Sequence, residues 1–264
     1  MNSVKTIDEV IVLLNAIIHE CISTKSRAGY FASLYHKVTC RVRDGIANHE
    51  FEDGSRMERL DIMFASRFLQ AYDLWKNEKE PTASWKICFE ATKKSSPLVL
   101  QQLLLGINAH INLDLGIAAV ETAKEAGQPL VNIHKDFNSI NTILASLTYE
   151  VMNEINTVSP LLSLMGFHSS NNSILIQFTI GNARDGAWCF AEDLFPRAEK
   201  DYAGCISERD KTIKQLAEGI VRAKGLLRFT VWIIHLFEWK NPAKIIRVFH
   251  EHKKMFIRLK KQRG

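Results

Sequence analysis

One apolar segment sets the architecture of this protein: PLVLQQLLLGINAHINLDLGIAAVETAKEA, residues 97–126. A helix built from this segment is apolar on nearly all sides, and such a helix is buried among other helices. Pro97 suits the first turn of a helix, whereas Gly127, with Pro129 beyond it, suits the end. The segment therefore predicts one continuous helix at the centre of the protein.

The chain on either side of this segment carries clear helix signals and almost no strand signals. Capping boxes at residues 6–9 (TIDE) and 55–58 (SRME) each precede apolar residues at helical spacing. These patterns predict an all-α, single-domain helical bundle of about eight to ten helices around the central helix 97–126. We place this domain at residues 1–239 and a basic C-terminal helix or tail at 240–264.

Composition narrows the class of protein. The chain has 264 residues, 46% of them hydrophobic and 24% charged, which is enough to bury a core without disulfides or a structural metal. Its five cysteines are scattered and form no C-x-x-C pair, as expected in a reducing compartment. The apolar run at 226–239 is shorter than the roughly 20 residues of a spanning helix. We therefore expect a cytoplasmic protein, which the basic tail would allow to act at a membrane surface.

The charge of the chain is unevenly distributed. Residues 240–264 contain nine Lys or Arg and one acid, a net charge of +8, so that residues 1–239 carry −3 of the total of +5. The tail has an apolar stripe (Ile245, Phe249, Phe256, Leu259) beside lysines, which is typical of a helix lying on an anionic membrane surface or an acidic protein partner. Nucleic acid is not an expected partner, because the acidic body offers no second basic patch.

Polar residues within apolar helix faces are the candidates for chemistry. His110 and Asp114 are four residues apart and share one helix face, and Asp61 falls within the apolar stripe of the third predicted helix. A buried carboxylate needs a cation, a metal or hydrogen-bond donors. Two interpretations are open: a structural pair of His110 with Asp114, or a pocket in which all three residues are catalytic. In such a pocket they would also be ligands for one divalent metal, zinc, iron or manganese.

Four more residues are candidates for substrate binding. Arg184, within FTIGNARDGAWCF (178–190), can neutralise a buried acid or hold an anionic group of a substrate. Asn108 and Asn112 lie on the face of the central helix nearly opposite His110, where they can tie it to its neighbours or reach a ligand. Arg27 opens the second predicted helix.

Several segments together resemble a known family. SRAGYFASLYHKVT (26–39), GINAHINLDLG (106–116) and ARDGAW (183–188) are similar to a bacterial family labelled domain of unknown function number 5995, over about residues 4–225. The resemblance implies a helical single domain with a recurring polar set, which is Arg27, Asp61, His110, Asp114 and Arg184, and it brings no reaction. His110 and Asp114 alone also resemble the H-x-x-x-D motif of all-helical zinc-dependent phospholipase C and P1-type nucleases.

Two functions from different classes fit these observations. The first is an enzyme of hydrolase, lyase or cyclase type that acts on a small, partly apolar molecule in a pocket of the bundle. The second is a non-catalytic helical binding module that docks through its basic C-terminal helix. Nucleotide-driven and classical serine-hydrolase chemistry is not expected, because the sequence has no P-loop, G-x-S-x-G, H-E-x-x-H or Rossmann motif.

Overall fold

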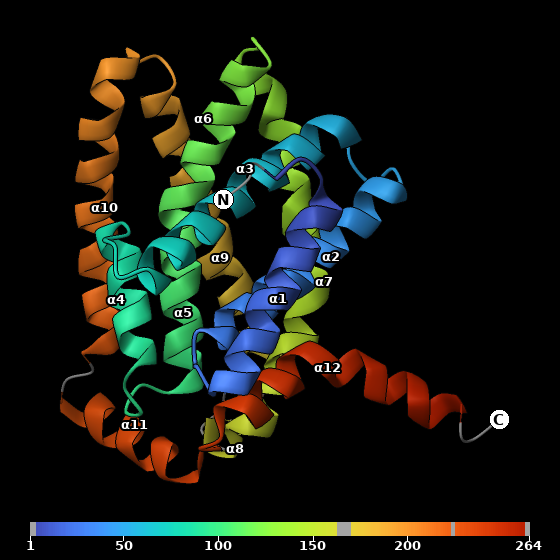
Figure 1. Cartoon of the computed structure of the whole chain (residues 1–264), viewed down its shortest axis with the longest axis vertical. Coiled ribbons are helices and arrows are strands. Elements are labelled where there is room, and N and C mark those ends of the chain that lie inside the picture. The colour runs from blue at the N-terminus through green and yellow to red at the C-terminus, as the bar shows by residue number, and fades with distance from the viewer. Residues whose placement is uncertain (1–3, 163–169, 223–224, 262–264) are drawn as a thin grey trace.

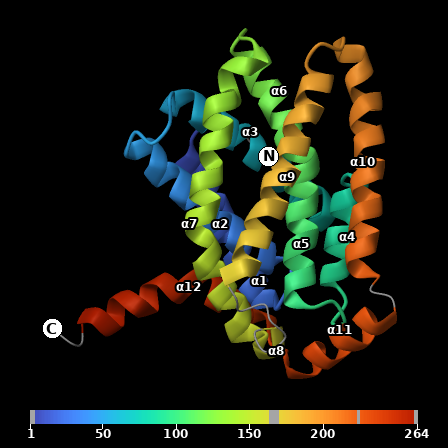
Figure 2. The same ribbon diagram turned by 180° about the vertical axis from the view of Figure 1, so that it is seen from behind.

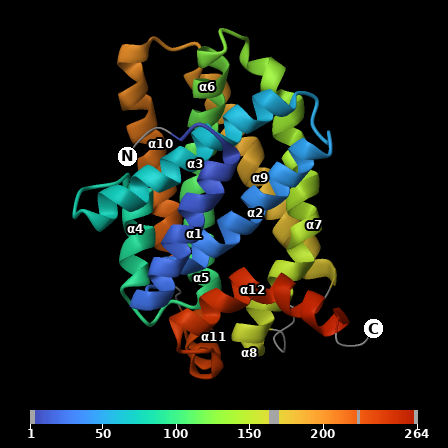
Figure 3. The ribbon, with the colours of Figure 1, turned by 45° about the vertical axis from the view of Figure 1, so that its right-hand side comes forward.

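A computed structural model describes residues 4–162, 170–222 and 225–261, without the side chains of 170–179, 226–227 and 252–261. Every regular element in these ranges is helical, which confirms the all-α prediction. The first four helices cover one side of the molecule (Figure 3). They are α1 (Ile7–Thr24), α2 (Gly29–Ala47), α3 (Gly54–Lys76) and α4 (Ala83–Thr92).

Local sequence explains where these helices begin. Thr6 caps α1 by accepting a hydrogen bond from the backbone N–H of Glu9 at 3.2 Å, as its capping box predicts. For α3 the predicted cap was wrong. Asp53 rather than Ser55 holds the first turn, through the backbone N–H of Arg56 at 2.9 Å.

The predicted central helix exists, but it is not one continuous α-helix. It consists of α5 (Val99–Ala109), a π-helical turn (η1, His110–Asp114) and α6 (Leu115–Glu125), and it ends at Gly127 in the left-handed conformation. Helices α2, α3, α4, α7, α9 and α10 pack around it. It is long and apolar enough to cross a membrane by length and composition, yet 78% of its most apolar window is buried inside the protein, as in the core helix of a soluble protein.

The second half of the chain covers the opposite side of the central helix. Long helices run along the molecular axis there (Figure 2). At one end of the bundle α11 (Gly225–Phe237) and the start of α12 (Pro242–Lys261) lie across it (Figure 1). The other elements are η2 (Leu130–Ile133), α7 (His134–Val158), α8 (Pro160–Leu162), α9 (Ser170–Leu194) and α10 (Glu199–Val221).

The buried apolar side chains form two clusters that meet at the π turn. Ala109, just before the turn, belongs to a cluster built mainly from α1, α2, α3, α4, α5 and α12. Leu113, inside the turn, belongs to a second cluster built mainly from α6, α7 and α9, with Met57 and Leu60 from the first half of α3. The π turn therefore lies where the two parts of the core join.

The start of α12 is part of the first cluster. Ile245, Ile246 and Phe249 are each at most 1% exposed, and α12 packs on α1, α2 and α7. Two members of the apolar stripe predicted to face a membrane or partner are therefore buried. Phe256 and Leu259, the other two, lie outside the described side chains.

Candidate functional site

The π turn buries His110 and Asp114 side by side. Their side chains are 3% and 2% exposed, and Nδ1 of His110 lies 3.3 Å from Oδ2 of Asp114. One turn earlier, Gly106 lets the ring of Phe31 approach the helix, because a Cβ atom at this glycine would lie only 2.3 Å from Cδ2 of Phe31. The predicted His–Asp pair is thus formed deep in the bundle, against an aromatic wall.

Other helices supply the remaining hydrogen bonds of the Asp114 carboxylate. Nε of Arg67 in α3 donates to Oδ1 at 3.1 Å, and the indole N–H of Trp85 in α4 donates to Oδ2 at 2.8 Å. Arg67 also reaches Glu121, at 3.4 Å. Asp114 therefore has a cationic partner and a neutral donor, which is how a buried carboxylate is stabilised.

Aromatic rings enclose the imidazole of His110. The Phe64 ring stacks on it with centroids 3.5 Å apart, and the Tyr35 ring meets it edge-on at 4.4 Å. Burial lowers the pKa of His110, an effect that Asp114 opposes without outweighing it. A neutral imidazole that donates its Nδ1 proton to Asp114 has a lone pair on Nε2, and Nε2 is buried without a hydrogen-bond partner among the described residues.

Asp61 is the second buried carboxyl group of this region, and its surroundings differ. It lies one helical turn before Phe64, is 4% exposed, and its Oδ2 has no hydrogen-bond partner within the described ranges. Burial, with a smaller contribution from the charge of Glu58, raises the pKa of Asp61 to about 7. Near neutral pH this carboxyl group is consequently present in both its protonated and its ionised form.

Tyr35 connects the two carboxyl groups electrostatically. Burial raises the pKa of this phenol well above its ordinary value, and the charge of Asp61 raises it further. The Thr39 side chain lowers it, and the charge of Asp114 adds a smaller increase. Its buried hydroxyl has no hydrogen-bond partner in the described part of the chain. We call Tyr35, Asp61, Arg67, Trp85, His110 and Asp114 the polar core cluster.

The predicted metal site does not fit this geometry. The described residues contain no group of three or more His, Cys, Asp and Glu side chains that could hold a metal ion. Asp114 is already bound by Arg67, Trp85 and His110, and Asp61 forms no hydrogen bond or ion pair with His110 or Asp114. Asp114, which was predicted to bind a metal ion, is instead paired with the guanidinium of Arg67.

The arginines predicted to bind substrate lie elsewhere in the fold. Arg184 of α9 is buried against α7, where its Nε donates to Asn141 at 2.7 Å and its NH2 group donates to the carbonyl of Phe137. It neutralises neither buried acid, and burial lowers its pKa to about 10. Arg27 donates to the carbonyl of Thr92, at 3.3 Å.

Asn108 and Asn112 tie the central helix to α10. The amide of Asn108 donates to the carbonyl of Ile213 at 3.0 Å, and Asn112 donates to Asn108 at 3.0 Å. Arg209 of α10 completes the contact through the carbonyl of Asn112, at 3.0 Å. These hydrogen bonds agree with the expectation that Asn108 and Asn112 connect the central helix to its neighbours.

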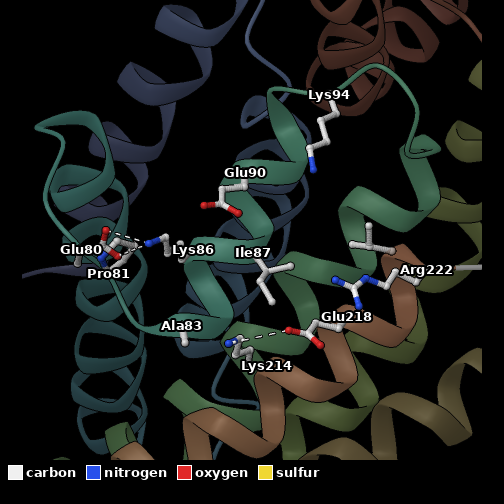
Figure 4. A pocket seen from close by; sticks show the side chains of 11 residues that line it. Glu80, Pro81, Ala83, Lys86, Ile87, Glu90, Lys94, Lys214, Glu218 and Arg222 are labelled. Carbon is white, nitrogen blue, oxygen red and sulfur yellow. Dashed lines mark hydrogen bonds and ion pairs between the residues drawn. The ribbon is translucent and has the colours of Figure 1, made fainter.

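Two surface grooves lie near the cluster's helices, but no residue of the cluster lines either one. The first, of about 510 Å³, lies between α4 and α10 and is edged by the ion pairs of Lys86 with Glu80 and Lys214 with Glu218 (Figure 4). The second, of about 700 Å³, runs along the outer face of α3 past Ile62. The cluster itself is an interior feature.

Sequence reasoning missed the roles of Trp85 and Arg67. In the sequence Trp85 is one aromatic residue among many in apolar helices, and Arg67 is one of several arginines in the helix that carries Asp61. A usable signal existed, because a carboxylate in an all-apolar helix needs donors from neighbouring helices. The sequence could not specify which helix supplies them.

Comparisons with known proteins identify the family. A model described as a family of unknown function, DUF5995, matches residues 7–223. No curated protein and no solved structure matches the chain. The weaker likeness to zinc-dependent phospholipase C and P1-type nucleases stays unconfirmed.

Proposed function

Since the chain belongs to the DUF5995 family, whose function is unknown, the family supplies no reaction, and we propose from the geometry that this protein is an enzyme. It would perform acid–base chemistry on a small, partly apolar molecule held at the polar core cluster. All five cysteines are free, and we propose a cytoplasmic location.

A single observation carries the proposal. Nδ1 of His110 contacts a carboxylate that is itself fixed by two donors, while Nε2 is left without a partner. This arrangement fixes the tautomer and orientation of an imidazole that acts as a base. A buried polar atom without a partner costs about 1–3 kcal/mol, and a catalytic role is one of the physical reasons for which a protein retains it.

The neighbouring groups suit proton transfer. His110 would accept a proton at Nε2, because its lowered pKa keeps it neutral at pH 7. Asp61, with a pKa of about 7, would deliver a proton or take one up at the same pH. Tyr35 would orient the substrate through its hydroxyl. Hydrolysis, elimination and cyclisation each need such a pair of proton transfers.

The π turn is additional support. Single π turns inside α-helices are rare and occur frequently at functional sites. Here the turn includes both His110 and Asp114, and it interrupts an otherwise regular helix. A small molecule would reach it by local separation of the surrounding helices, since His110 is 3% exposed.

One experiment tests the chemistry directly. Purified protein is incubated with a pool of small metabolites, and depletion of each component is followed by mass spectrometry for the wild type, His110→Gln and His134→Gln. His134 is an exposed histidine and serves as the matched control. We expect His110→Gln to lose about 10²-fold or more of the turnover, the usual contribution of a general base, and His134→Gln to lose none.

A second measurement needs no substrate. Nitrogen NMR of the imidazoles should show His110 neutral at pH 7, with its proton on Nδ1. A proton on Nε2, or an imidazolium ion, would contradict the role of Nε2 as base.

A further inference from the structure

Helix α11 is apolar on both of its faces. Ile234 is buried in the first core cluster and Val231 packs against it, so one face holds the helix to the body. The opposite face exposes Phe229, Trp232 and Leu236 by more than half of their surfaces. Phe237 and Trp239 continue this surface at 62% and 38% exposure. We call these five residues the α11 face.

The α11 face cannot turn inward, because the end of the helix is anchored. Glu238 is buried and accepts hydrogen bonds from the backbone N–H of Val99 at 3.1 Å and from Oγ of Ser159 at 2.7 Å. The backbone N–H of Trp239 donates to the carbonyl of Val158 at 2.9 Å. The large apolar side chains are therefore held outward, and such a concentration on a surface marks an interaction site.

The exposed charges of residues 225–250, which include α11 and the start of α12, are of one sign. Arg228, Lys240, Lys244 and Arg247 are all exposed. Glu238 is the only acid between residues 225 and 250, and its carboxylate faces the interior. A surface of tryptophan, phenylalanine and cations complements the headgroup region of an anionic lipid bilayer.

We infer that the α11 face docks the protein on the surface of an anionic membrane. The aromatic side chains would enter the boundary between headgroups and acyl chains, while the cations contact lipid phosphates. With 13 residues α11 is too short to span a bilayer, so it would lie in the plane of the surface. This inference is independent of the chemistry at His110, and it moves the membrane contact from the predicted stripe of 240–264 to α11.

A second copy of the chain is a poorer occupant. A two-fold contact through the α11 face would bring the same patch from each copy together, and thus like charges. Within residues 225–250 neither copy could offer an acid there, since Glu238 is engaged inside. An anionic bilayer satisfies both the apolar and the charged part of the surface.

Vesicle flotation of the full-length protein tests the inference. Phosphatidylcholine vesicles with and without phosphatidylserine are compared for the wild type, Trp232→Glu and Tyr149→Glu. Tyr149 lies on α7, is 75% exposed, and provides the matched control. We expect binding only to the anionic vesicles, a loss of about tenfold or more in Trp232→Glu, and no change in Tyr149→Glu.

Charge reversal separates the two parts of the surface. Lys244→Glu and Arg247→Glu should each weaken binding by at least roughly fivefold and reduce its dependence on salt. Sedimentation velocity of the wild type and Trp232→Glu determines whether either protein is a monomer or a dimer. The inference is overturned if the wild type does not float with anionic vesicles, or if Trp232→Glu floats as well as the wild type. A wild-type dimer that Trp232→Glu converts to a monomer, without flotation of either, would assign the face to a second copy.

Discussion

Asp61 and Asp114 are two buried carboxyl groups that the fold treats differently. Asp114 receives a guanidinium and an indole N–H, whereas Oδ2 of Asp61 receives no hydrogen bond from the described residues. Burial raises the pKa of Asp61 to about 7, so this carboxyl group changes its protonation state near neutral pH.

The raised pKa of Asp61 predicts a pH-dependent stability. In the unfolded chain Asp61 ionises near 3.8, whereas in the folded protein it keeps its proton up to about 7. Between these values the folded state holds the additional proton, so the free energy of unfolding falls as pH rises. Asp61→Asn removes the ionisable group, so its free energy of unfolding does not fall in this way. Between pH 4 and pH 8 we expect the free energy of unfolding of Asp61→Asn, relative to that of the wild type, to rise by about 4 kcal/mol.

Urea unfolding of both proteins across this pH range measures the effect. The quantity compared is the difference in the free energy of unfolding between Asp61→Asn and the wild type. It should be smallest at pH 4 and largest at pH 8. A difference that is constant with pH would mean that Asp61 ionises normally in the folded protein.

Trp85 offers a test of how Asp114 is stabilised. Trp85→Phe removes the N–H donor to the buried carboxylate and keeps most of the aromatic packing. A hydrogen bond to a buried charge contributes about 1.5–3 kcal/mol, and we expect a loss of this size in the free energy of unfolding. Trp188→Phe is the matched control, because its N–H donates at 2.9 Å to Glu192, which is exposed. An equal loss in the two variants would contradict the special role of Trp85.

At the scale of helices, the periodicity of the sequence predicted the architecture well. The burial of 97–126, its end at Gly127 and the cap of α1 all follow from local composition and spacing. The π turn could not be predicted in this way, because its residues have the same helical spacing and propensity as those of a regular α-helix. It arises where one helix must serve two core clusters.

The candidate site was predictable only in part, because the sequence predicts contacts within one helix and not those between helices. The spacing of His110 and Asp114 fixes their pairing within one helix. The partners that come from α3 and α4 depend on how those helices cross the central one, which a single sequence does not contain. The prediction of a metal at Asp61, His110 and Asp114 depended on such a convergence, and Arg67 occupies the position that a cation would have taken beside Asp114.

Gly106 tests the packing between α5 and α2. Alanine is the better helix former by about 1 kcal/mol, yet its Cβ would lie 2.3 Å from the Phe31 ring, which also packs beside His110. We expect Gly106→Ala to destabilise the protein by roughly 1–3 kcal/mol, as overpacking of a core does. Gly219→Ala on α10 meets no atom within 4 Å and should be slightly stabilising. Thermal unfolding compares the two, and a more stable Gly106→Ala would show that the contact with Phe31 is loose.

At the scale of the whole molecule, the family and the folded body do not end at the same residue. The family match stops at 223, yet Ile234 of α11 and Ile245, Ile246 and Phe249 of α12 are buried in the first core cluster. Residues beyond the match therefore complete the core. They also carry the α11 face, so the part of the chain outside the family match both closes the fold and presents the proposed membrane surface.

Two truncations locate the end of the folding unit. Ending the chain after Trp239, at the predicted domain boundary, removes Ile245, Ile246 and Phe249 from the core. Each fully buried side chain of this kind contributes about 1.5–3 kcal/mol, so the combined loss is comparable with the roughly 5–15 kcal/mol that stabilises a typical domain. We expect this chain to be largely unfolded or aggregated by circular dichroism and sedimentation. Ending the chain after Glu251 keeps all three side chains and should preserve cooperative unfolding. A stable, cooperative fold in the chain that ends after Trp239 would contradict this expectation and place α12 outside the domain, as the sequence alone predicts.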